Sequence, residues 1–260
     1  MFSSQYHHFN SVLRHWVRGI RFYLGLAILY ITITVWLWVE RAYTGSSLYG
    51  IRAEEAYAWL ATVFLIAALG IGPVYHVFRN LAGKRIAFES RRLLGIGAAW
   101  FASLHVLIAY GSLFRFSNPL SLPGTYQRSF LLGSLVWLIL LVMAFTSCNA
   151  AMRKLGVWWF RIHRLVYLAA VVIILHAFKI GTHASSVGYV TGFATVSLVL
   201  LLLHSAAIAK QGKQASGSQL AAIMLMTIAL VVILSYGYDH RAQRSVPQTG
   251  RNGSTHAQIY

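Results

Sequence analysis

The chain has 260 residues, of which 58% are hydrophobic and only 10% are charged, and its formal net charge is +17. Soluble domains have about 45–50% apolar and about 25% charged residues, so this composition excludes an ordinary soluble domain. The basic residues lie in short segments between apolar runs, which is typical of membrane proteins and argues against a nucleic-acid-binding domain.

Seven apolar runs are long enough to cross a membrane, which takes about 20 residues of helix. Because lipid offers the backbone amides no partner, each run is expected to be a continuous helix. The sequence therefore predicts an all-α, polytopic membrane bundle, with a six-helix core at 20–209 and an additional transmembrane helix at 218–237. The expected spans are residues 20–39, 56–78, 94–114, 129–148, 158–179, 187–209 and 218–237.

Basic residues alternate between the two sides of this bundle. They are concentrated before the first run, between the second and third, between the fourth and fifth, and after the sixth. The positive-inside rule then places the basic N-terminal segment 1–19 in the cytoplasm. With seven spans the tail at 238–260 lies outside, and its polar composition predicts disorder.

Histidines occur within the runs, where ionisable residues are rare and usually functional. Asp and Glu are nearly absent there, which argues against a proton relay or a cation transporter. The single cysteine, Cys148, excludes a Cys-ligated cluster. Neutral imidazoles without acids suit a metal, and haem is the commonest such case in a helical bundle. The histidines in question are His76 near the end of the second run, His105 in the third, His163 and His176 in the fifth, and His204 late in the sixth.

Helix rise gives the depth of these side chains. His163 and His176 are 13 residues apart, which is roughly 20 Å along a helix axis. His105 lies about as far from Arg92, on a run with the same direction, so His105 and His176 are expected at similar depth toward the outer face. Two such imidazoles can fill both axial positions of one haem b iron.

His163 lies near the cytoplasmic face and needs a separate partner. His76, His204 or a water could serve, and Gly72 and Pro73 favour His76 slightly because they could kink the helix and turn its end inward. For His76 and His204 a helix-packing role is the more common alternative. The number of haems, one or two, is left open.

Arginines next to His163 have two explanations. Arg161 and Arg164 could pair with haem propionates. They are equally well explained as positive charge on the cytoplasmic side.

Two segments carry a family resemblance: TSCNAAMRKLGVWWFRIHRLVYLAAVVIILH, from Thr146 to His176, and RRLLGIGAAWFASLHVLIAY, from Arg91 to Tyr110. They resemble the ferric-reductase-like transmembrane family, most closely the haem-binding membrane subunits of periplasmic methionine sulfoxide reductase systems (the MsrQ/YedZ group). The resemblance implies a six-helix bundle in the bacterial inner membrane with haem between the third and fifth helices. His105, His163 and His176 fall on the family's ligand positions.

The resemblance also implies the flow of electrons. The donor would be a cytoplasmic flavin reductase or membrane quinol, and the acceptor a periplasmic molybdenum enzyme that reduces oxidised methionine. The preferred function is thus electron transfer through b-type haem. One alternative is a terminal reductase of ferric iron or another small acceptor. The other is a non-redox transporter or assembly subunit whose histidines only pack.

Overall fold

The computed structural model describes the backbone of residues 2–113, 116, 118, 121, 124–180, 187–211, 219–220, 223–228 and 230–233. The expected tail at 238–260 and the end of the expected seventh helix, 234–237, lie outside these residues. No strand occurs within them, and the expected all-α class is confirmed. The helices are α1 (Phe2–Tyr43), α2 (Tyr49–Val77), α3 (Lys84–Ile108), the π-helical turn η1 (Ala109–Leu113), α4 (Gly124–Phe145), α5 (Asn149–Leu155), α6 (Val157–Ile180) and α7 (Val187–Gln211).

Six helices are long and apolar enough to cross a membrane, and they correspond to the first six expected spans. The chain is therefore a multi-pass membrane protein. The expected seventh helix is described only in part, as the apolar helix Ile223–Ile233, so its crossing stays a prediction.

Two elements differ from expectation. The polar segment at the N-terminus is helical and continues into the first span as α1. Helix α5 was not expected, because its seven residues have no apolar run. It begins after Cys148, whose sulfur accepts a hydrogen bond from the Ala151 amide at 3.3 Å. It ends at Gly156, where φ is +50°, a conformation that favours glycine.

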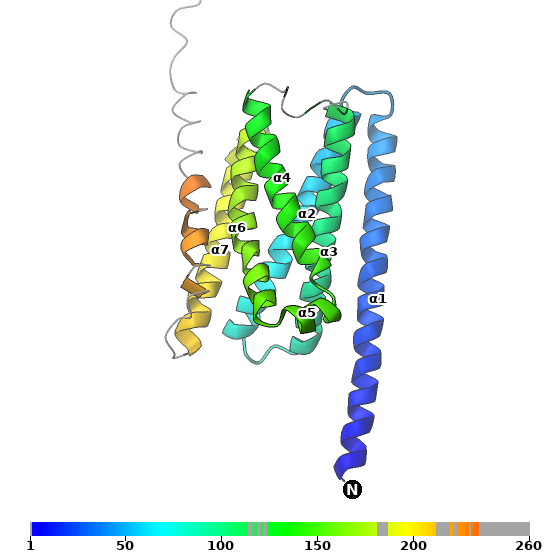
Figure 1. Cartoon of the computed structure of the whole chain (residues 1–260), viewed down its shortest axis with the longest axis vertical. Helices are drawn as coiled ribbons and strands as arrows, with labels where there is room; N and C mark the ends of the chain where they lie inside the picture. The colour runs from blue at the N-terminus through cyan, green and yellow to red at the C-terminus, as the bar shows by residue number, and fades with distance from the viewer. Residues whose placement is uncertain are drawn as a thin grey trace, which may run out of the picture.

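The helices run alternately up and down, with α1 at one side of the bundle and α7, next to the apolar helix Ile223–Ile233, at the other (Figure 1). Helices α2 and α3 pack along each other, as do α4 and α6, and α7 packs on α2. We call the end formed by the 78–83 connection, α5 and the end of α7 the basic end (Figure 1). The end formed by the 44–48 connection, η1 and the start of α4 is the opposite end.

The interior between the two ends is apolar. Small and branched side chains from α2, α3, α4 and α6 fill it, including Ala98 and Ala169, which are fully buried. A polar contact also occurs in this region: the Trp137 indole nitrogen donates to the Ser103 hydroxyl at 3.0 Å and so links α4 to α3. Large apolar side chains such as Trp36 and Leu138 lie exposed on the outer surface of the bundle. This is expected of a surface that faces lipid rather than water.

Candidate functional site

Four histidines occupy two depths in the bundle. His105 is near the end of α3 and His176 near the end of α6, so both are at the opposite end. His163 is near the start of α6 and His204 near the end of α7, so both are at the basic end. The structure thus brings the His105 and His176 rings into contact at the opposite end, and it places His163 and His204 on the wall of one cavity at the basic end.

The His105 and His176 rings are adjacent, with centres 6.3 Å apart and planes at 81°. A metal–nitrogen bond is about 2.0 Å, and a ring centre lies about 1.2 Å behind its nitrogen, so two imidazoles on one metal have centres about 6.4 Å apart. The observed separation would therefore allow His105 and His176 to hold one iron between them. The expectation of similar depth for these residues agrees with this geometry.

Hydrogen bonds select the ligating nitrogen of this pair. His105 Nδ1 donates to the Glu54 carbonyl of α2 at 3.1 Å, and His176 Nδ1 donates to the Ser129 carbonyl of α4 at 2.9 Å. A carbonyl oxygen only accepts, so Nδ1 carries the proton in both rings. Nε2 then has the free lone pair, which is the arrangement of metal-ligating histidines held by a second shell.

The backbone next to each ring of this pair is unusual: a glycine lies against His176, and a π-helical turn follows His105. A Cβ atom at Gly133 of α4 would lie 2.8 Å from Cε1 of His176, so only glycine lets α4 approach this ring. Helix α3 passes into the π-helical turn η1 directly after the turn that carries His105. Single π-helical turns are rare and are frequent at functional sites.

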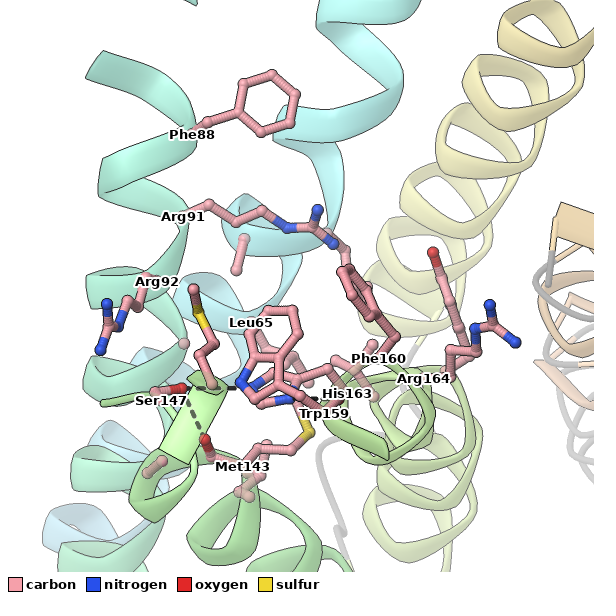
Figure 2. Close-up of a pocket in the computed structure, with 18 of the residues that line it drawn as sticks. Leu65, Phe88, Arg91, Arg92, Met143, Ser147, Trp159, Phe160, His163 and Arg164 are labelled. Carbon is pink, nitrogen blue, oxygen red and sulfur yellow. Dashed lines mark hydrogen bonds between the residues drawn. The ribbon is translucent and has the colours of Figure 1, made fainter. Parts of the chain in front are cut away.

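At the basic end, a cavity of about 850 Å³ lies between α2, α3, α4 and α6, and residues of α1, α5 and α7 also line it. Its volume falls within the range of about 300–1,000 Å³ of ligand pockets. Apolar and aromatic side chains and several charged residues line it; Figure 2 shows Arg91 extending from α3 over the pocket. The wall includes Leu65, Leu69, Leu140, Val166, Phe88, Trp159, Phe160 and Tyr167, and the charged residues are Arg21, Glu89, Arg91, Arg92, Arg153 and Arg164.

His163 projects into this cavity (Figure 2). Its ring stacks on Trp159 with centres 4.0 Å apart, and its Nδ1 donates to the Trp159 carbonyl at 3.0 Å. Nε2 lies 3.3 Å from the Ser147 hydroxyl, which already donates to the Met143 carbonyl at 2.6 Å. The free lone pair of His163 is therefore again on Nε2.

His204 lines the same cavity and is 8% exposed. Its Nδ1 donates to the Leu200 carbonyl one turn earlier at 2.9 Å, and its ring meets the edge of Tyr167. From the sequence, His204 was one of three candidates for this end and was more readily explained by packing. The sequence already placed His204 at the depth of His163, but it could not show that both side chains line one cavity.

His76 lies at the same end but in a different setting. It is exposed, one residue before the end of α2, and it is not among the residues that line the cavity. Pro73 lies within α2, but the helix continues to Val77. A role for His76 in binding stays a prediction, and the geometry gives it no support.

The two arginines next to His163 also differ. The Arg161 guanidinium lies over the Trp158 ring, 4.5 Å from its centre, and does not line the cavity. Arg164 does line the cavity (Figure 2), so of the two it is the one placed to meet an anionic group.

Metal ions held directly by protein usually have three or more ligands. No group of three or more His, Cys, Asp or Glu side chains able to hold such an ion occurs in the described part of the chain. Paired imidazoles instead fit an iron whose other four ligands belong to a porphyrin.

Comparison with known proteins gives one family. Residues 52–174 match the family described as ferric reductase like transmembrane component. The matched segment contains His76, His105 and His163, ends two residues before His176, and does not reach His204. No solved structure matches the chain. The match supports the family expected from the sequence, and over residues 52–174 this multi-pass membrane protein is similar to a ferric reductase like transmembrane component.

Proposed function

We propose that this protein binds b-type haem and carries electrons across the membrane, from a donor at its basic end to an acceptor at the opposite end. The observation that carries the proposal is the His105–His176 pair, whose ring centres are 6.3 Å apart. Their Nδ1 atoms donate to main-chain carbonyls of α2 and α4, so both Nε2 atoms are available to one iron.

The residues around the pair suit electron transfer. When bound, haem supplies one-electron chemistry. Two histidine ligands leave no open position on iron, which disfavours oxygen chemistry. The interior between this pair and the basic end is apolar, with Ala98, Ala99 and Ala169 buried, and would keep water from the ligands. His163 is the proposed ligand at the basic end, where the cavity opens among arginines.

Orientation and partners follow from charge and resemblance. The basic end lies in the cytoplasm by the positive-inside rule, and the membrane is proposed to be the bacterial inner membrane. A cytoplasmic flavin reductase or membrane quinol would deliver electrons to the cavity. The resemblance of the Thr146–His176 segment supports a periplasmic methionine sulfoxide reductase as the acceptor.

A second candidate is a terminal reductase that gives electrons directly to ferric iron or another small acceptor. The family match favours it by its description. The purified protein, reduced beforehand, can be mixed with a ferric chelate or with a protein acceptor. Equal rates of reduction of the two would support this candidate. A strong preference for the protein acceptor would support the carrier.

The test is a reduced-minus-oxidised optical spectrum of the purified protein with haem quantified per chain. The proposal expects a b-type spectrum with at least one haem per chain. In proteoliposomes with a reductant sealed on the basic side, an impermeant acceptor on the other side should be reduced. Colourless protein from cells with ample haem would overturn the proposal and favour an assembly subunit.

A further inference from the structure

Arg79 and Lys210 lie together at the basic end, where α2 and α7 both end (Figure 1). The Arg79 guanidinium donates to the Lys210 carbonyl at 2.8 Å, and the Lys210 ammonium donates to the Val77 carbonyl at 2.8 Å. Carbonyls at a helix C-terminus have no partner within the helix and carry a partial negative charge, which favours a cation there. Each helix end thus receives the cation of the other, and two positive charges are held close together although 131 positions separate them in the sequence.

This cation pair has no carboxylate to balance it. Glu89 is the only acidic residue described at this end, and it forms an ion pair with Arg21. A guanidinium has five N–H donors and an ammonium three, so each hydrogen bond to a carbonyl uses only one donor of its cation. Neither Arg79 nor Lys210 has another hydrogen bond or ion pair with a described residue. The pair therefore keeps its charge and most of its donors for a ligand.

The pair lies at the depth where the membrane surface is expected. Helices α2 and α7 are two of the six apolar spans, and these spans end at Val77 and Lys210. Phe78 and Leu81, in the same connection as Arg79, are 54% and 46% exposed. Exposed apolar side chains directly beside cations are typical of the region between lipid headgroups and acyl chains.

We propose that the Arg79–Lys210 pair binds the phosphate of an anionic phospholipid, whose acyl chains lie against the apolar surface next to it. The phosphate accepts charge-assisted hydrogen bonds from the donors that the two carbonyls leave free. A lipid is favoured over an acidic protein because cations directly beside the ends of spans attract anionic headgroups, and because apolar side chains adjoin this pair. The bound lipid bridges the ends of α2 and α7. The site is separate from the cavity, which neither cation lines, and does not depend on haem.

The test compares two lipids on the full-length protein in detergent by native mass spectrometry. Phosphatidylglycerol and phosphatidylcholine with the same acyl chains are mixed with the protein in equal amounts, and wild type is expected to retain phosphatidylglycerol preferentially. Each cation contributes about fivefold to the affinity for an anionic lipid, so Arg79→Gln and Lys210→Gln should each lower the preference about fivefold, and the double variant further. Glutamine keeps an N–H donor for the carbonyl at each helix end. Lys154→Gln on α5 is the matched control, because it removes an exposed cation of the same end.

The remaining variant and probes separate the alternatives. Arg79→Lys keeps both charges and should keep the preference, which distinguishes lost charge from a folding defect. An unchanged preference in the double variant, or an equal loss in Lys154→Gln, would overturn the site. Displacement of phosphatidylglycerol by inorganic phosphate at the same concentration would assign the pair to free phosphate instead of lipid. Absence of a preference in wild type would also overturn the proposal, and binding of a poly-glutamate peptide by wild type but not by the double variant would then assign the pair to an acidic protein.

Discussion

Gly133 of α4 lies directly against the imidazole of His176 of α6: a methyl group at position 133 would be 2.8 Å from Cε1 of that ring. The contact is to a ring held by its own hydrogen bond to the Ser129 carbonyl, so the ring has little freedom to move away. The close approach of α4 therefore restricts the position of the His176 ring beside its two nitrogens.

Gly133→Ala should disturb the haem of the His105–His176 pair. Alanine favours a helix by about 0.5–1 kcal/mol, but overpacking typically costs about 1–3 kcal/mol, so the clash should dominate. Shifted low-spin g-values and a lower haem content are expected from electron paramagnetic resonance and haem assay. Gly192→Ala is the control, because nothing lies within 4 Å of its added methyl group. Equal behaviour of the two variants would refute the role given to Gly133.

Ser129→Ala should leave the same haem in place. His176 bonds to the main-chain carbonyl of Ser129, which the substitution keeps, whereas the Ser129 hydroxyl is buried without a hydrogen-bond partner among the described residues. Removing an unpaired buried hydroxyl should change the unfolding free energy by no more than about 1 kcal/mol. Thermal denaturation and haem content measure both effects. Loss of haem in Ser129→Ala would show that the hydroxyl, not the carbonyl, is the important partner.

Trp159→Leu should alter the haem assigned to His163. The indole stacks on His163 at 4.0 Å and holds its place through a bond from Nε1 to the Thr146 carbonyl at 3.0 Å. Trp159→Phe keeps an aromatic ring and loses only that bond, worth about 0.5–1.5 kcal/mol, so its effect should be smaller. Trp158→Leu is the control, since Trp158 is 61% exposed and contacts Arg161 instead. The measured quantities are the spin state and the midpoint potential of the haem. If Trp159→Phe or Trp158→Leu changed them more than Trp159→Leu does, the stacking role of Trp159 would be contradicted.

Reporter fusions test the orientation. A reporter inserted in the 78–83 connection should be active in the cytoplasm, and one inserted in the 44–48 connection should be active outside. A reporter after Tyr260 should be active outside if the helix at 218–237 crosses the membrane. Cytoplasmic activity of that last fusion would leave six spans and remove the seventh.

The membrane fold and the shared depth of His105 and His176 could be predicted because both depend only on distances along the sequence. Apolar length defined the six spans, and helix rise placed His105 and His176 at one depth. The cavity could not be predicted, since it depends on how seven helices, α1 to α7, pack against one another. The preference for His76 over His204 rested on a possible kink at Pro73, whereas in the structure α2 continues to Val77 with His76 exposed.

The most direct measurement of the central claim compares the optical and electron paramagnetic resonance spectra of His105→Ala and His176→Ala with wild type. Because their ring centres are 6.3 Å apart, which would let both rings bind one iron, both variants should lose the same low-spin component. His76→Ala, at the other end of the bundle, should keep it. Loss of different components in the two variants, or retention of the full wild-type spectrum in either, would contradict the account.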